Sequence, residues 1–278
     1  MTRPFWQVDV FSPTPYLGNS VAVVLDGNEL STDRMQQVAR WTNLSETTFV
    51  LPPTTTDADY RLRIFTPGGE LPFAGHPTLG SAHAWLENGG TPRYADRVVQ
   101  ECAAGLVVVR HAQDRLSFAA PPTVRDGPLD EEYLDRIGTA FGITRDRILA
   151  HQWVDNGPGW AVVRLGSADE VLALEPDLSR IPDAMIGAIG PYPEGSRHAF
   201  ELRTFAPGAG VPEDPICGSM NASVAQWLIT TGTAPATYQV SQGTRLGRTG
   251  TVHITTDPSG TIWIGGTTAT LIRGTITV

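Results

Sequence analysis

The sequence predicts an α+β protein that is built from two similar halves and in which antiparallel sheet dominates. The stretch from Arg61 to Trp85 returns as Glu201 to Trp227, and each copy opens on Arg-x-Phe-x-Pro-Gly at a constant spacing of 140 residues (203 − 63). Short apolar runs with strand-like alternation, separated by turns rich in Gly and Pro, fill most of the chain. Solenoid repeats recur every ~20–50 residues, so the long spacing favours two duplicated half-domains.

In the first half, hydrophobic periodicity and turn residues place the elements. Strands are predicted at 5–11, 21–25, 47–51, 61–65, 98–102 and 106–110, and helices from 31 or 32 to about 41 and from 77 to about 88. The last two strands form a hairpin that turns at Ala103 to Gly105. The segment 121–127, rich in Pro and Gly, is the best candidate for a linker between the halves.

The second half begins the pattern again. A helix is predicted at 129–141, strands at 160–165, 251–255 and 261–264, and short elements at 171–174 and 185–189. Ala161-Val162-Val163 repeats Ala22-Val23-Val24 at a spacing of 139 residues (162 − 23), which extends the duplication beyond the central motif.

Two of the predicted helices start at equivalent places in the repeat. After three inserted residues, Ala74-Gly75-His76 corresponds to Cys217-Gly218-Ser219 at a spacing of 143 (217 − 74). Pro77 suits a first helical turn, so His76 and Ser219 are expected at the N-caps. Helix N-termini carry unpaired N–H groups and partial positive charge, and two of them could converge on one anion, such as a small carboxylate.

The composition excludes several classes of function. A formal net charge of −9 without basic runs argues against nucleic acid or an anionic membrane as partner. All 20 basic residues are arginine, so a pyridoxal Schiff base, a P-loop and a lysine base are excluded.

Metal and cofactor motifs are missing from the sequence. Cys102 and Cys217 are the only cysteines, and the six histidines lack the spacing of metal ligands, so no metal is predicted. No G-x-G-x-x-G follows a strand, which gives a nucleotide cofactor no support. The N-terminus lacks the apolar run of a secretory signal and no run of membrane-spanning length follows, so we expect a cytoplasmic protein.

Four separated blocks resemble signature sequences of the PhzF, or phenazine-biosynthesis-like, isomerase family. They are GNSVAVV (18–24), NLSETTFV (43–50), ELPFAGHPTLGSA (70–82) and GVPEDPICGSM (210–220). The resemblance implies a diaminopimelate-epimerase-like fold with two pseudo-symmetric halves, each an antiparallel sheet curled around a central helix, and an active site in the cleft between them. The halves would be 1–121, with 265–278 returning to it, and 122–264. It also implies a homodimer.

The resemblance further implies a reaction and a set of site residues. The family moves a proton on a small carboxylate substrate without a cofactor. Glu46 matches its acid/base glutamate, and His76 and Asp214 are the other candidate catalytic residues. The candidate substrate-binding residues are Asn19, Gly75, Cys217, Gly218 and Ser219. Ser20 stands where the family usually has proline, and Ile216-Cys217 replaces the commoner Ala-Thr, which leaves the substrate open.

Each candidate also has a structural interpretation. Glu46, three places after Asn43, fits a capping box, although the residues that follow it favour a strand. His76 is a poor N-cap residue, which favours a ligand-facing role. Ser219 and Asp214 are ordinary cap and turn residues, and a free cysteine such as Cys217 is usually a small buried hydrophobe.

The sequence thus predicts an isomerase in small-molecule or secondary-metabolite biosynthesis, acting on a diene-like or amino-acid-like carboxylate. Glu46 would take a proton from an activated carbon and return it at another position. An epimerase of a small amino acid is the alternative, and it would need a second base where Ala74 stands opposite Cys217 in the repeat. A hydrolase with Cys217 as nucleophile and a non-catalytic binding protein of the same fold remain as further alternatives.

Overall fold

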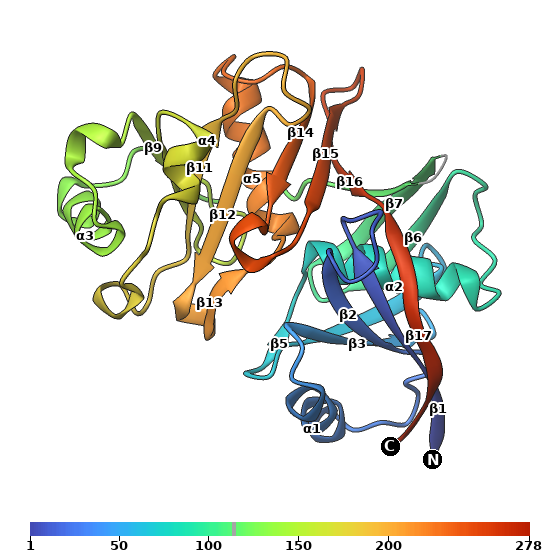
Figure 1. The fold of residues 1–278 in the computed structure, drawn as a ribbon. Coiled ribbons are helices and arrows are strands. Elements are labelled where there is room, and N and C mark those ends of the chain that lie inside the picture. Colours follow the sequence, from blue (N-terminus) through green and yellow to red (C-terminus); the bar gives the residue numbers. More distant parts are fainter. Residues whose placement is uncertain (113–114) are drawn as a thin grey trace. The chain divides into compact units, whose positions relative to one another are not determined.

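The computed structural model describes residues 1–112 and 115–278, which divide into two compact units. The first unit consists of Met1–Ala119 and Gly265–Val278, and the second of Ala120–Ile264. Figure 1 shows the first unit in blue to green with the red strand β17, and the second in green to orange.

The described part of the first unit contains a mixed sheet and the helices α1 and α2. Its elements are β1 (Thr2–Val10), β2 (Asn19–Val24), α1 (Thr32–Thr42), β3 (Glu46–Leu51), β4 (Tyr60–Phe65), β5 (Glu70–Leu71), α2 (Gly75–Glu87), β6 (Arg97–Cys102), β7 (Gly105–Ala112), β8 (Arg115–Ala119) and β17 (Thr268–Thr277). The strands pair in the order β17-β1-β2-β3-β4-β6-β7-β8, and β5 also pairs with β4.

The second unit repeats this plan and adds a helix before it. Its elements are α3 (Glu131–Phe141), β9 (Ala150–Trp153), β10 (Ala161–Arg164), α4 (Ala168–Leu172), β11 (Ile186–Pro191), β12 (Phe200–Ala206), β13 (Val211–Asp214), α5 (Gly218–Thr230), β14 (Thr237–Gln242), β15 (Gly250–Thr256) and β16 (Ile262–Gly266), whose last two residues belong to the first unit.

Strand pairing shows that the two units share one topology. In the first unit β2 pairs with β3 and β4 with β6 in parallel, and the other pairs are antiparallel. In the second unit β10 pairs with β11 and β12 with β14 in parallel, while β9–β10, β11–β12, β12–β13 and β14–β15 are antiparallel. The predicted α+β class is therefore confirmed, with two parallel pairings per unit among the antiparallel ones.

A helix lies at the centre of each sheet. The α2 helix contacts β1, β2, β3, β4, β6, β7, β8 and β17, and it is buried almost continuously from Gly75 to Ala84. In the second unit α5 is likewise buried over most of its length. The side chain of Met220 on α5 packs so close to Gly187 of β11 that a Cβ at this position would lie 3.0 Å from the Met220 sulfur.

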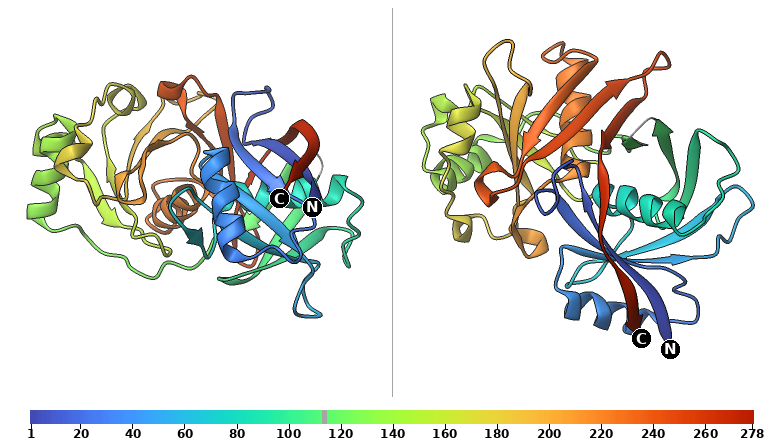
Figure 2. Two further views of the ribbon diagram at one scale, coloured as in Figure 1. Left: turned by 90° about the horizontal axis from the view of Figure 1, so that it is seen from below. Right: turned by 45° about the vertical axis from the view of Figure 1, so that its right-hand side comes forward.

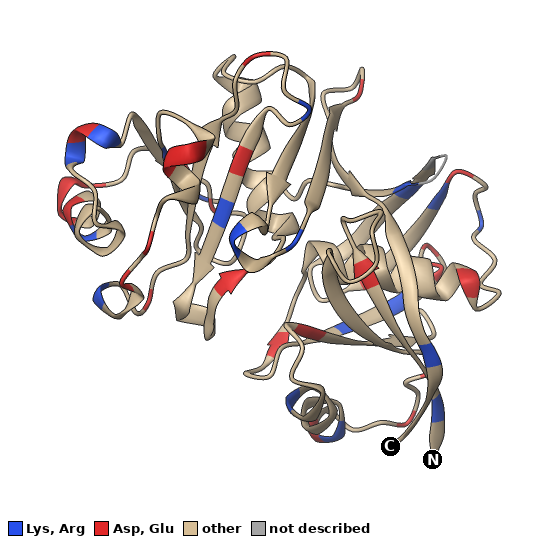
Figure 3. Ribbon diagram, in the orientation of Figure 1, with Lys and Arg blue, Asp and Glu red and all other residues tan. Residues whose placement is uncertain are grey.

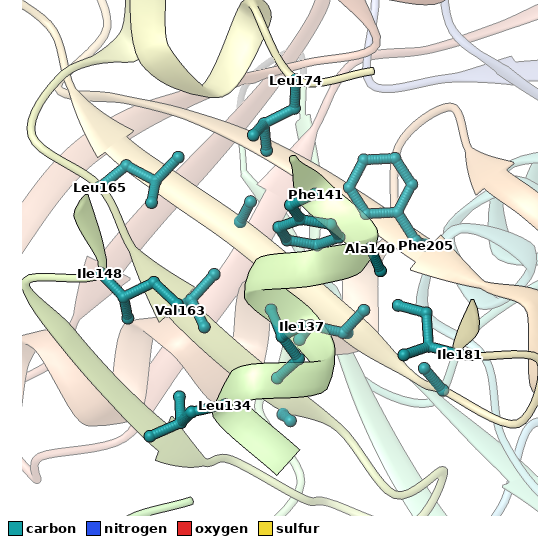
Figure 4. Close-up of a cluster of buried hydrophobic side chains, with 14 of the residues drawn as sticks. Leu134, Ile137, Ala140, Phe141, Ile148, Val163, Leu165, Leu174, Ile181 and Phe205 are labelled. Carbon is teal, nitrogen blue, oxygen red and sulfur yellow. The ribbon is translucent and has the colours of Figure 1, made fainter. Parts of the chain in front are cut away.

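Outer helices cover the other face of each sheet. In the second unit α3 and α4 pack on β10, β11 and β12 through a cluster that includes Leu134, Ile137 and Phe141 (Figure 4). In the first unit α1 packs Met35 and Val38 against Phe49 and Phe65. Two faces are thus buried on each central strand, which explains continuous apolar runs such as Val21–Val24.

The two ends of the chain meet within the first unit. The β17 strand pairs with β1 along its whole length, and the backbone N–H of Val278 donates to the carbonyl of Met1 at 2.8 Å. Both views in Figure 2 show the N and C labels side by side. The last strand of the chain therefore belongs to the sheet that the first strand begins.

Charged residues are spread over both units with the two signs mixed, as Figure 3 shows. No helix among the described residues is long and apolar enough to cross a membrane.

Candidate active site

Glu46 is the first residue of β3, at the point where the chain leaves α1. Asn43 ends α1 in the left-handed conformation (φ 54°), so it caps the C-terminal end of that helix rather than starting a new one. The capping-box interpretation of Glu46 is therefore wrong. The β-prone residues after Glu46 form β3 in parallel with β2, with Val21 in register with Glu46, and only 9% of Glu46 is exposed.

His76 lies against Glu46 inside the first unit. Its Nε2 is 3.3 Å from Oε2 of Glu46, somewhat longer than a well-formed hydrogen bond, and 3% of the residue is exposed. Its Nδ1 is 3.3 Å from the amide nitrogen of Asn19, whose Oδ1 accepts from the Ser45 hydroxyl at 3.4 Å. Asn19, Glu46 and His76, together with Gly75 next to His76, therefore form one buried polar cluster.

Burial lowers the pKa of His76 to about 3, and the backbone of Ser20 partly opposes this shift. The ring is neutral at pH 7, so the contact with Glu46 is not an ion pair, although the two charged forms would attract. An ionised carboxylate can only accept, so a hydrogen bond from His76 to Glu46 requires the tautomer that carries its proton on Nε2. In that tautomer the Asn19 amide donates to Nδ1.

The lowered pKa of His76 predicts acid sensitivity. Between pH 7 and pH 5 the unfolded chain takes up a proton, at a pKa near 6.5, that the folded ring does not, so stability falls as the pH falls through this window. We expect the free energy of unfolding to drop by about 2 kcal/mol more in the wild type than in His76→Gln, measured by urea denaturation at both pH values. Contributions of all other groups are common to both proteins and cancel in the comparison. Equal drops would contradict a neutral, buried His76.

The predicted N-caps are corrected by the structure. Ala74 and Cys217 occupy the N-caps of α2 and α5, and neither gives a side-chain hydrogen bond to the helix. His76 and Ser219 are instead the second residues of their helices, because Gly75 and Gly218 already have helical conformation. Pro77 is tolerated at the third position, where its missing N–H would also have had no partner within the helix. The predicted meeting of both helix starts on one anion stays a prediction.

A second cluster lies at the start of α5 in the second unit. Asp214 ends β13, and its Oδ1 accepts from the backbone N–H of Ile216 at 3.1 Å. The sulfur of Cys217 is 3.5 Å from the Ser219 hydroxyl oxygen. Asp214, Cys217, Gly218 and Ser219 are thus neighbours along one turn, and Ser219 is the partly exposed residue of the helix start.

The thiol of Cys217 is in a poor environment for a base. Burial raises its pKa well above the usual range, and the charge of Asp214 raises it further. A thiol that stays protonated at neutral pH is neither nucleophile nor proton acceptor. This disfavours the hydrolase, and it disfavours an epimerase in which Cys217 is the base.

Two residues of the second cluster escaped the sequence analysis. The indole N–H of Trp160 donates to the Ser219 hydroxyl at 3.0 Å. The amide oxygen of Gln242, which is fully buried, accepts from the backbone N–H of Cys217 at 3.1 Å. Neither residue carried a sequence signal of its polar contact, because Trp160 corresponds to the apolar Val21 in the repeat (160 − 139) and Gln242 lies outside the repeated motif.

The hollow of about 390 Å³ beside α2 is a separate feature, lined by His83, Glu87 and other residues outside both clusters. Both ring nitrogens of His83 are engaged, by the hydroxyls of Thr268 at 2.9 Å and Thr270 at 3.0 Å. These two hydrogen bonds connect α2 to β17.

Fold and clusters together define an α+β protein of two duplicated units with a buried glutamate–histidine pair in the first. The family model described as "Phenazine biosynthesis-like protein" matches residues 8–275, and the chain belongs to this family, PhzF. It is 38% identical to "Antisense-enhancing sequence 1" of Schizosaccharomyces pombe, over 97% of both chains. It is 36% identical to trans-2,3-dihydro-3-hydroxyanthranilate isomerase of Pseudomonas aeruginosa, over 91% of this chain and 90% of that one.

Solved structures show the same fold. A PhzF-family protein of Bacillus anthracis superposes over 100% of both chains with a TM-score of 0.85 and 23% identity. At this identity the likeness establishes the fold alone.

Proposed function

We propose that the protein isomerises a small conjugated carboxylate by moving one proton, with Glu46 as the single acid/base. The proposal rests on one difference between the duplicated units, which is the residue at the start of the equivalent strands β3 and β11. In the first unit β3 opens on buried Glu46, 3.3 Å from His76. In the second, the position equivalent to Glu46 is Met185, just before β11, which has no proton to exchange.

The chemistry follows from these groups. Ionised Glu46 would take a proton from a carbon made acidic by conjugation and return it at another carbon of the same system. The neutral ring of His76 would hold Glu46 in place beside the substrate without adding a positive charge. Asp214 and the hydroxyl of Ser219 would bind substrate polar groups, and the N–H groups at Gly75 and Gly218 would stabilise its carboxylate and the negative charge that develops.

The name of the Pseudomonas aeruginosa relative supplies the substrate to test. We propose that trans-2,3-dihydro-3-hydroxyanthranilate, a cyclic diene carboxylate, represents the substrate class, and that the reaction serves small-molecule biosynthesis. The test is incubation in deuterated water followed by proton NMR. Label at one new carbon of the product, with no exchange when enzyme is omitted, supports the proposal. Unchanged substrate would leave a non-catalytic binding protein as the better interpretation.

Replacing Cys217 by Ala separates isomerase from epimerase. Because its thiol stays protonated and Ala74 stands at the equivalent place in the first unit, we expect Cys217→Ala to retain turnover within a few-fold of the wild type. Recovered substrate should keep its configuration, which chiral chromatography measures. Inactive Cys217→Ala together with inverted substrate in the wild type would establish the epimerase.

The homodimer and the cytoplasmic location stay predictions. Analytical ultracentrifugation of the purified chain tests the first of them.

A further inference from the structure

We infer that Trp160 is a positioning residue that makes the Ser219 hydroxyl a directed hydrogen-bond donor toward the substrate. Trp160 lies just before β10 and is 4% exposed, and its indole N–H donates to Ser219 Oγ at 3.0 Å. The backbone of Ser219 is fixed as well, because its carbonyl accepts from Asn156 Nδ2 and from Ser223 Oγ, each at 3.1 Å. Both the side chain and the main chain of Ser219 are therefore held from within the second unit.

The direction of the Ser219 O–H follows from hydrogen-bond roles. An indole N–H can only donate, so the Ser219 oxygen accepts on the side of Trp160 and its own proton must point elsewhere. Among the described residues, the other side-chain atom placed near it is the sulfur of Cys217 at 3.5 Å, a weak acceptor. In the free protein the sulfur can accept this proton, and a stronger acceptor, such as a carboxylate, carbonyl or hydroxyl oxygen of a ligand, would displace so weak a partner from this partly exposed hydroxyl.

The first unit contains the same arrangement with different residues. His76 corresponds to Ser219 in the repeat, and the side-chain amide of Asn19 lies 3.3 Å from its Nδ1. Trp160 corresponds to Val21, two residues after Asn19 on β2. Residues two apart on a strand face the same side of the sheet. The longer side chain of Trp160 can therefore reach Ser219 in the second unit, as the side chain of Asn19 reaches His76 in the first. Each unit therefore holds the second residue of its central helix from the start of the same strand.

The identity of the ligand rests on the proposed function, so the test measures binding apart from turnover. The probe is 3-hydroxyanthranilate, the aromatic counterpart of the proposed substrate, which has no diene to isomerise. Its Kd is measured by calorimetry for the wild type, Trp160→Phe, Ser219→Ala and the double variant. The control is Trp153→Phe in the same unit, whose ring stacks on Tyr133 at 5.5 Å between centroids and packs against the apolar cluster that includes Leu134 of α3.

We expect Trp160→Phe to weaken probe binding about 2- to 10-fold, which corresponds to the loss of one net hydrogen bond. The double variant should bind the probe as Ser219→Ala does, because the hydrogen bond is already absent there. Trp153→Phe should leave Kd unchanged. In the free protein, the Trp160 indole N–H resonance in ¹⁵N NMR should move in Ser219→Ala, which reports the hydrogen bond independently of any ligand.

If Trp160→Phe weakened probe binding as much in the Ser219→Ala variant as in the wild type, Trp160 would act through general packing. That result would overturn the inference. The inference also fails if Trp160→Phe binds like the wild type, or if the wild type does not bind the probe. Binding that follows the expected pattern while trans-2,3-dihydro-3-hydroxyanthranilate is not turned over would sink the proposed function and leave the role of Trp160 standing.

Discussion

Replacing Glu46 by Gln is expected to lower turnover by roughly 10²–10⁴-fold, the usual contribution of a positioned acid/base group. The amide keeps the size of the carboxylate and can still face His76, so the fold and substrate binding should persist. What disappears is the group that accepts a proton from carbon, and the second unit offers Met185 at the equivalent position. The measurement is kcat with trans-2,3-dihydro-3-hydroxyanthranilate, alongside Kd for 3-hydroxyanthranilate.

A matched control for Glu46→Gln is Glu201→Gln. Glu201 is fully buried on β12 and accepts from the Tyr192 hydroxyl at 2.8 Å, outside both clusters. The same substitution at a buried carboxylate there should leave kcat within a few-fold of the wild type. If Glu46→Gln turned over as fast as this control, the base would have to be another group, and Asp214 would be the next candidate.

Local signals in the sequence placed most elements. Ser31 caps α1 as expected, accepting from the backbone N–H of Arg34 at 3.2 Å, and the hairpin of β6 and β7 turns between Cys102 and Gly105. Elements that depend on pairing with a distant segment of the chain were harder to predict. β1 begins at Thr2 rather than Phe5, because its first residues pair with the end of β17, more than two hundred residues away. The edge strand β9 and the strand β14 were missed, since neither alternates clearly.

The same distinction applies to the candidate site, where local motifs identified residues but not the properties that depend on distant segments. Family blocks pointed to Glu46, His76 and Asn19, and the structure brings these three together. Spacing alone could not show that His76 is neutral, because its pKa depends on burial by segments from elsewhere in the chain. The role of Trp160 was hidden for a similar reason: a tryptophan before a strand normally indicates core, and its polar contact lies 59 positions further along the chain.

The repeated Arg-x-Phe-x-Pro-Gly motif provides a comparison of stability within one chain. Arg203 on β12 is 5% exposed in its side chain, and it pairs with Glu213 through two hydrogen bonds of 2.9 and 2.8 Å. It also donates to the carbonyls of Val171 and Leu174 at the end of α4. Arg63 on β4 makes the equivalent pair with Glu70, but there the side chains are 22% and 34% exposed.

Arg203→Met is therefore expected to destabilise the protein by roughly 3–5 kcal/mol, because it leaves a largely buried carboxylate, 13% exposed, and two carbonyls at a helix end without their donor. Arg63→Met, the matched control, should cost ~1 kcal/mol or less, since water can solvate Glu70 once the arginine is gone. Urea denaturation measures both, and hydrogen exchange read by mass spectrometry should place the loss of protection in β12 and α4 for Arg203→Met. If the two variants lost similar free energies of unfolding, burial would not explain the contributions of these duplicated ion pairs to stability.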